Sequence, residues 1–151
     1  FRNRGLDPAR HLLRIPWLSP ASFLTLLDLC DVYLDCPAFS GYTTAWLALH
    51  RGLPIVTLEG PCLRQRLAAG LLRRAGLPAT VASAADEYVA IAADLARTCR
   101  DEARRAALRA AISAAAPNVD DDVRVVRAFE DCLASALATR PAGATGEPGE
   151  A

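Results

Sequence analysis

Short apolar runs alternate with helical segments through the first half of the chain. The runs are bounded by glycine, proline or charged residues, as is typical of short buried strands. They predict strands over residues 11–17, 32–34, 54–58 and 80–82, the last of them weak. The segments between them predict helices over residues 21–30, 43–50 and 63–75. This alternation is typical of βαβ units, so we predict an α/β fold with a parallel sheet and flanking helices.

Beyond Ser83 the pattern becomes helical throughout. One stripe at helical spacing comprises Tyr88, Ile91, Ala92 and Leu95, and a second comprises Val126, Phe129, Leu133 and Leu137. A basic, alanine-rich helix over residues 101–115 is predicted between them. We expect these three helices to pack on the sheet edge or on a neighbouring domain. The segment 139–151 has too little apolar surface to order itself and predicts a disordered tail, so residues 1–138 form the predicted domain.

Composition narrows the possible partners. The chain of 151 residues carries 17 basic and 17 acidic side chains, and this balance argues against a nucleic-acid partner. No apolar run is long enough for a membrane span. The five cysteines are scattered and odd in number, which favours reduced thiols in a cytoplasmic protein. All basic residues are arginine, which we interpret as bacterial coding bias, and the absence of methionine indicates a fragment.

The segment around Gly41 is the leading candidate for chemistry. A predicted strand runs into a glycine turn, and Thr43 and Thr44 then open a predicted helix. The first N–H groups of a helix lack backbone partners and carry positive partial charge, so they bind phosphate well. A glycine lets the backbone approach a ligand, and two hydroxyls add donors. The alternative is that Thr43 merely caps the helix.

Three ordered blocks of sequence carry a family resemblance. They read DVYLDCPAFSGYTTAWLALHRGLPIVTLEG, then LRQRLAAGLLRRAGLP, then EYVAIAADLA. Together they resemble the C-terminal catalytic half of the O-GlcNAc transferase and SPINDLY-type glycosyltransferases, in order and in spacing. The resemblance implies the Rossmann-like C-terminal lobe of a GT-B enzyme, which holds a UDP-sugar without a cofactor or an essential metal. It also implies transfer of a sugar, such as N-acetylglucosamine, to a protein hydroxyl or a glycan acceptor.

The resemblance assigns roles to particular residues. Gly41, Thr43 and Thr44 match the phosphate-binding positions of the family. Tyr42 stands where O-GlcNAc transferases usually have histidine, and it keeps a hydrogen-bonding hydroxyl. Leu47 occupies the position of the aspartate that holds the ribose hydroxyls, and a leucine accepts no hydrogen bond. Either another group takes over, or the donor differs, or the lobe binds nucleotide weakly.

Two further residues are candidates for the same site. Phe23 is placed to stack on the nucleobase, although a core position is the common fate of a phenylalanine. Arg66 matches an arginine of the second block and either holds the loop 59–62, reaches the cleft or pairs with a surface carboxylate. Asp120, Asp121 and Asp122 precede a predicted helix and fit capping better than metal binding.

No catalytic residue is assigned, because the resemblance places the general base on an N-terminal lobe, with helical repeats upstream as further partners within the polypeptide. The alternative function is a catalytically degenerate lobe that acts as a protein-interaction module, and Leu47 is the feature that favours it.

Overall fold

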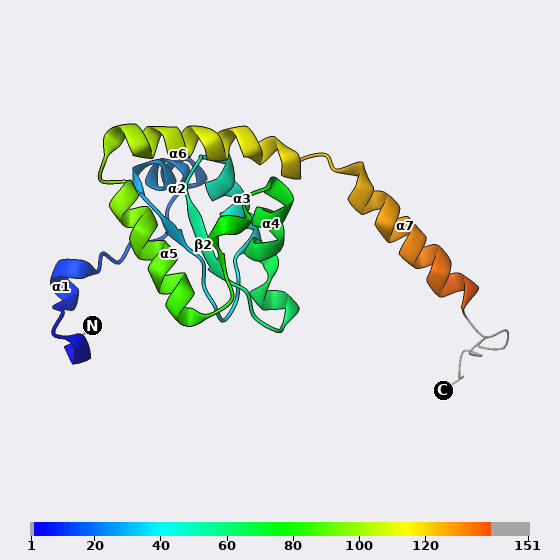
Figure 1. Ribbon diagram of the computed structural model, residues 1–151, viewed down its shortest axis with the longest axis horizontal. Helices are drawn as coiled ribbons and strands as arrows, with labels where there is room; N and C mark the ends of the chain where they lie inside the picture. Colours follow the sequence, from blue (N-terminus) through cyan, green and yellow to red (C-terminus); the bar gives the residue numbers. More distant parts are fainter. Residues whose placement is uncertain (1, 140–151) are drawn as a thin grey trace.

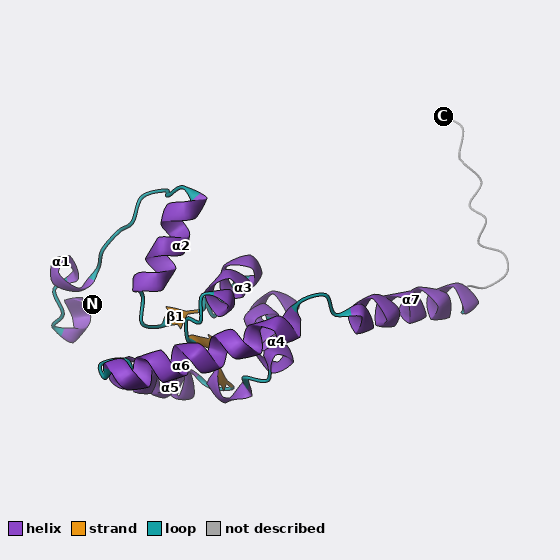
Figure 2. Ribbon diagram, turned by 90° about the horizontal axis from the view of Figure 1, so that it is seen from above, coloured by secondary structure: helices purple, strands orange, loops and turns teal. Residues whose placement is uncertain are grey.

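The computed structural model describes residues 2–139 of the chain. Its centre is a three-stranded parallel sheet of β1 (Tyr33–Leu34), β2 (Ile55–Leu58) and β3 (Val81–Ala82), in that order. Tyr33 is in register with Ile55, and Thr57 with Val81. The middle strand is the most buried, because both of its edges are paired and helices cover its faces (Figures 1 and 2).

Seven helices surround or extend from this sheet, joined by short 3₁₀ turns. They are α1 (Pro8–His11), α2 (Pro20–Leu29), α3 (Tyr42–His50), α4 (Leu67–Ala75), α5 (Ala85–Thr98), α6 (Glu102–Ala115) and α7 (Val123–Ala138) within residues 2–139. Figure 2 shows the strands between α3 on one side and α5 on the other. The apolar core lies between α3, α4 and β2, and includes Ala48, Leu49, Leu53, Ile55 and Leu72. The predicted fold class is therefore confirmed.

Local sequence explains where the main helices begin and end. Ser19 caps α2 by accepting a hydrogen bond from the Ser22 amide at 3.2 Å, and Pro20 occupies the first turn. Gly76 ends α4 in the left-handed conformation at φ 81°, which glycine adopts without steric cost. Asp101 caps α6 through the Arg104 amide at 3.0 Å. These signals act over a few residues, so they can be predicted from the sequence.

Two predicted elements are wrong. Residues 12–17 form no strand, and the side chains of Leu13 and Trp17 are 84% and 100% exposed. A strand is stabilised by hydrogen bonds to a neighbouring strand, and this segment lies outside the three-stranded sheet. The predicted helix 63–75 is split into a 3₁₀ turn, Leu63–Gln65, and α4, because Arg66 has a non-helical backbone conformation.

The last three helices differ in how they pack. Helix α5 packs on β2 and β3, and α6 packs on α3. Helix α7 buries no residue and extends away from the sheet, with its predicted apolar stripe exposed (Figure 1). The predicted tail, apart from Thr139 at the end of α7, lies outside the described residues. Within residues 2–139, no helix has the length and apolar character needed to cross a membrane.

Candidate functional site

A buried carboxylate organises the turn between β1 and α3. Asp35 follows β1 directly and is 1% exposed. Its Oδ2 accepts hydrogen bonds from the hydroxyls of Ser40 and Thr57, both at 2.7 Å, and its Oδ1 accepts one from the Gly41 amide at 2.9 Å. The Ser40 hydroxyl oxygen also accepts from the Ala68 amide at 2.8 Å. Asp35 thus fixes the start of α3 to the sheet and, through Ser40, to α4.

The start of α3 carries no side-chain cap. The N-cap residue is Gly41, and no side chain accepts a hydrogen bond from the first amides of the helix. The alternative that Thr43 caps the helix is therefore wrong, because Thr43 already lies inside the first turn. Tyr42 and Thr43 are exposed, and Thr44 is half-buried. The first turn of α3 consequently presents uncapped N–H groups beside two hydroxyls, which is the chemistry of an anion site.

The tyrosine of β1 explains why position 41 is a glycine. A Cβ atom at Gly41 would lie 2.9 Å from the Tyr33 hydroxyl oxygen, which is closer than side chains normally approach. Burial raises the pKa of Tyr33, and the nearby Asp35 carboxylate raises it further, whereas a hydrogen bond with Thr44 acts in the opposite direction. Tyr33 therefore stays neutral, lies against the turn at Gly41 and bonds to the Thr44 hydroxyl.

An apolar cavity adjoins this helix start. Its volume is about 730 Å³, and it lies between α2, the segment before α2 and one face of α3. It is lined by Ile15, Pro16, Trp17, Leu18, Pro20, Phe23, Leu24, Leu26, Thr44 and Leu47. The structure therefore brings Phe23, Thr44 and Leu47 to one cavity, whereas Gly41, Tyr42 and Thr43 lie at the helix start and are not part of its wall.

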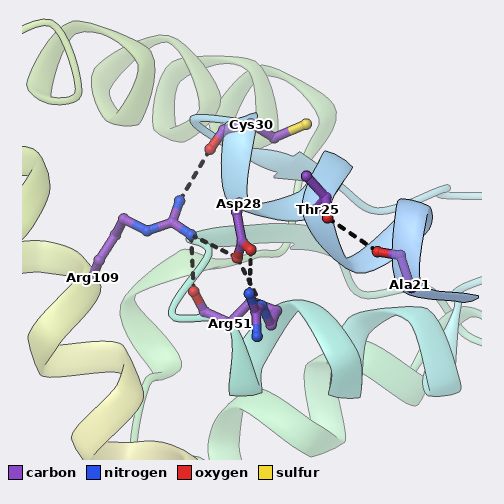
Figure 3. A network of polar contacts seen from close by, with 6 residues as sticks. All are labelled: Ala21, Thr25, Asp28, Cys30, Arg51 and Arg109. Atoms are coloured by element: carbon purple, nitrogen blue, oxygen red, sulfur yellow. Dashed lines mark hydrogen bonds and ion pairs between the residues drawn. The ribbon is translucent and has the colours of Figure 1, made fainter.

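An ion-pair network holds the two helices that border the cavity. Asp28 near the end of α2 accepts a hydrogen bond from Nε of Arg51, the residue after α3, at 2.7 Å (Figure 3). From α6, Arg109 donates to the carbonyls of Cys30 at 3.1 Å and Arg51 at 2.9 Å. The Arg51 guanidinium lowers the pKa of Asp28. These contacts tie the ends of α2 and α3 together and so fix one end of the cavity.

Arg66 pairs with a carboxylate of the loop after β2. Its Nε lies 2.9 Å from Oε1 of Glu59, and Nη1 of Arg73 lies 2.8 Å from the same oxygen. The hydrogen bond from Arg73, followed by that from Arg66, lowers the pKa of Glu59 to about 2. Of the roles considered for Arg66, the structure shows the carboxylate pairing, which also anchors the start of the loop 59–62.

Two of the three consecutive aspartates, Asp120 and Asp122, have separate structural partners. Asp122 caps α7 by accepting from the Arg124 amide at 3.1 Å, and it pairs with Arg74. Asp120 Oδ1 lies 3.1 Å from His50 Nε2 and accepts from Trp46 Nε1 at 3.3 Å. In the part of the chain that the structure describes, no group of three potential ligands is placed to hold a metal ion.

Sequence reasoning did not identify Asp35, Ser40 and Thr57 as site residues. A signal was present, because Asp35 is an acidic residue at the carboxyl end of a strand of a parallel sheet, where ligand sites form. Its partner Thr57, however, is 22 residues away in the sequence. Only the pairing of β1 with β2 brings that hydroxyl to the carboxylate.

Comparison with known proteins places this geometry in a family. The profile of glycosyl transferase family 41 matches residues 23–120. The chain is 37% identical over 92 residues to a UDP-N-acetylglucosamine–peptide N-acetylglucosaminyltransferase of Caenorhabditis elegans, covering 61% of this chain and 8% of the relative. It is 36% identical over 93 residues to a probable UDP-N-acetylglucosamine–peptide N-acetylglucosaminyltransferase SPINDLY of Oryza sativa subsp. japonica. That match covers 61% of this chain and 10% of the relative.

A solved structure gives the same result. The chain resembles a K341M mutant of Thermobaculum terrenum O-GlcNAc transferase with a TM-score of 0.73 and 32% identity, over 87% of this chain and 25% of that one. The expected GT-B lobe is thereby confirmed. Of the two curated relatives named above, the chain spans only about a tenth or less of the length. With a profile match over most of its length, the chain belongs to glycosyl transferase family 41.

Proposed function

We propose that this chain is the donor-binding lobe of a glycosyltransferase and that the start of α3 holds the diphosphate of a UDP-sugar. The observation that carries the proposal is the uncapped helix start, held to the sheet by the buried Asp35. Membership of glycosyl transferase family 41 supports sugar transfer in general. The names of these relatives specify UDP-N-acetylglucosamine and a peptide, and these are the donor and acceptor we propose.

In this proposal the lobe stabilises the leaving group. Sugar transfer breaks the bond between the sugar carbon and the diphosphate, so negative charge grows on the diphosphate oxygens. The first amides of α3 and the hydroxyls of Thr43 and Thr44 are preorganised donors for this charge. Because Asp35 fixes the turn before the ligand arrives, little reorganisation is needed as the charge develops.

The acceptor and the general base are proposed to lie in the rest of the polypeptide. The chain covers 8% and 10% of two curated relatives, so the complete activity cannot be assigned to these residues alone. We propose a second Rossmann-like lobe that faces the helix start, with helical repeats upstream. A protein-interaction module without catalysis is the alternative function, favoured by the apolar Leu47 in the cavity wall.

Calorimetric titration of the full-length protein with UDP tests the proposal. We expect saturable binding, weakened about tenfold or more by Thr44→Ala, since one hydrogen bond to a charged group is worth roughly 1.5–3 kcal/mol. Thr44→Ser should retain most of the affinity. The matched control is Thr25→Ala, because the Thr25 hydroxyl only donates to the Ala21 carbonyl of its own helix at 3.1 Å (Figure 3).

The outcomes separate the candidate functions. Absence of heat at millimolar UDP would favour the interaction module. Binding of inorganic diphosphate as tight as that of UDP would indicate a different phosphorylated ligand. Equal affinities of the wild type and Thr44→Ala would remove the helix start from the binding site.

A further inference from the structure

The cavity beside the helix start offers little hydrogen bonding to a ribose. We propose that Leu47 makes this site indifferent to the ribose hydroxyls, so that it accepts 2′-deoxyribonucleoside diphosphates at least as well as ribonucleoside diphosphates. The inference rests on the proposed function, in which the diphosphate lies at the start of α3. It concerns the class of nucleotide that the donor carries.

The position of Leu47 follows from helix geometry. Thr44 and Leu47 are three residues apart on α3, so their side chains lie on the same face, one turn from each other. Both contribute to the wall of the cavity of about 730 Å³. A nucleotide whose phosphates contact the first turn would therefore place its sugar about one turn further along, against Leu47. This is the place where a hydrogen-bond acceptor for the ribose hydroxyls would be needed.

No other side chain in the cavity wall replaces that acceptor. The polar side-chain groups of the wall are the Thr44 hydroxyl and the Trp17 indole N–H. An indole nitrogen is only a donor, and the Thr44 hydroxyl is the group that faces the diphosphate in the proposed function. No carboxylate or side-chain amide belongs to the wall. Among the residues that line this cavity, none therefore takes the place of the family's aspartate.

An unpaired hydroxyl against an apolar wall is unfavourable. A ribose hydroxyl that enters this cavity gives up hydrogen bonds to water and gains none from Leu47. A 2′-deoxyribose lacks one of these hydroxyls and avoids the loss. A thymine methyl group would in addition remove apolar surface from water. The wall therefore favours deoxyuridine or thymidine diphosphate over UDP, or at least does not discriminate against them.

The experiment is a competition among three nucleotides in the full-length protein. UDP, 2′-deoxyuridine diphosphate and thymidine diphosphate are titrated by calorimetry into the wild type and into Leu47→Asp. In the wild type we expect 2′-deoxyuridine diphosphate to bind at least as tightly as UDP. In Leu47→Asp we expect UDP to bind about five- to tenfold more tightly than the deoxy form, because a carboxylate accepts from the added hydroxyl.

Controls keep the result interpretable. Leu29→Asp is the matched variant, since Leu29 lies on α2, is 74% exposed and does not line the cavity, and it should leave the ratio of affinities unchanged. If Leu47→Asp fails to fold, the ratio in the wild type still decides. A preference of the wild type for UDP of fivefold or more overturns the inference while the proposed function stands. Absence of binding by all three nucleotides overturns both.

Discussion

Replacing Asp35 with asparagine isolates the contribution of the buried carboxylate to the site. The carboxylate accepts from three donors: two hydroxyls share Oδ2, and the Gly41 amide bonds to Oδ1. An asparagine side chain has one acceptor oxygen and one NH₂ group that donates. With the oxygen at the Oδ2 position, the NH₂ group faces the Gly41 N–H and leaves that donor unpaired. The substitution keeps the size of the side chain and changes only its hydrogen bonding.

The expected loss follows from these bonds. The Gly41 N–H is only partly buried, so leaving it unpaired costs about 1–2 kcal/mol, and two charge-assisted bonds that become neutral lose about 1 kcal/mol each. Part of this is offset because asparagine buries no charge. We therefore expect Asp35→Asn to reduce the free energy of opening of the sheet by about 2–3 kcal/mol. Binding of UDP should weaken as well, because the released turn no longer fixes the start of α3.

Hydrogen–deuterium exchange of the full-length protein measures this loss locally. Peptides that cover residues 31–58 report the opening of β1 and β2 without assuming two-state unfolding of a larger protein. Asp101→Asn is the control. Asp101 is exposed and caps α6 through one amide at 3.0 Å, so this substitution should lower the free energy of opening by about 1 kcal/mol or less. If Asp35→Asn proves no more harmful than Asp101→Asn, the turn is not held by the carboxylate and the reasoning fails.

Other predictions concern the supports of the fold. The folded pKa of Glu59 is about 2 against 4.5 ordinarily, so its pairing stabilises the fold above about pH 4.5, and this contribution is lost as the pH falls toward 2. Glu59→Gln should make the midpoint of urea unfolding less dependent on pH between about pH 2 and 6, and it should lower the free energy of unfolding by about 1 kcal/mol at neutral pH. A pH dependence equal to that of the wild type would contradict this. Gly52→Ala should lose about 2–3 kcal/mol in thermal unfolding, since Gly52 has φ 65° and a Cβ would lie 2.5 Å from Ser113 Oγ. Gly70→Ala, with nothing within 4 Å, should gain up to about 1 kcal/mol, and equal effects of the two substitutions would refute the steric argument.

Local signals predicted most of the fold between residues 20 and 116. The run at 54–58 became β2 because it is apolar, short and bounded by glycine and acid, and the predicted helix 43–50 differs from α3 by one residue. The strand at 11–17 failed because pairing with a neighbour, which a single segment does not encode, decides whether an apolar run is a strand. The helix 63–75 is interrupted at Arg66, next to Gln65, whose side chain donates to the Pro37 carbonyl at 3.2 Å across 28 residues, a contact that the local pattern does not encode.

The candidate site was predictable only in part for the same reason. A helix start beside Gly41 and the two threonines was predicted, since these signals are local, whereas the absence of a side-chain cap was found only in the structure. The buried network could not, because Asp35 meets Thr57 only after β1 has paired with β2. The cavity wall likewise needs α2 to lie against α3. The resemblance had identified Leu47 as a departure from the family, but its apolar neighbours became evident only from the packing.

The two ends of the proposed nucleotide site depend on different parts of the fold. The first turn of α3 is fixed from the sheet side by Asp35, whereas the wall around Leu47 depends on the position of α2, which Arg109 and Arg51 fix at the far end of both helices. Helix α3 can therefore keep a polar first turn, suited to a diphosphate, while the side chain at position 47 in the cavity wall changes. A change at Leu47 leaves every hydrogen bond of Asp35 intact. This separation gives a physical reason why nucleoside preference could diverge within the family while the phosphate end of the site is retained.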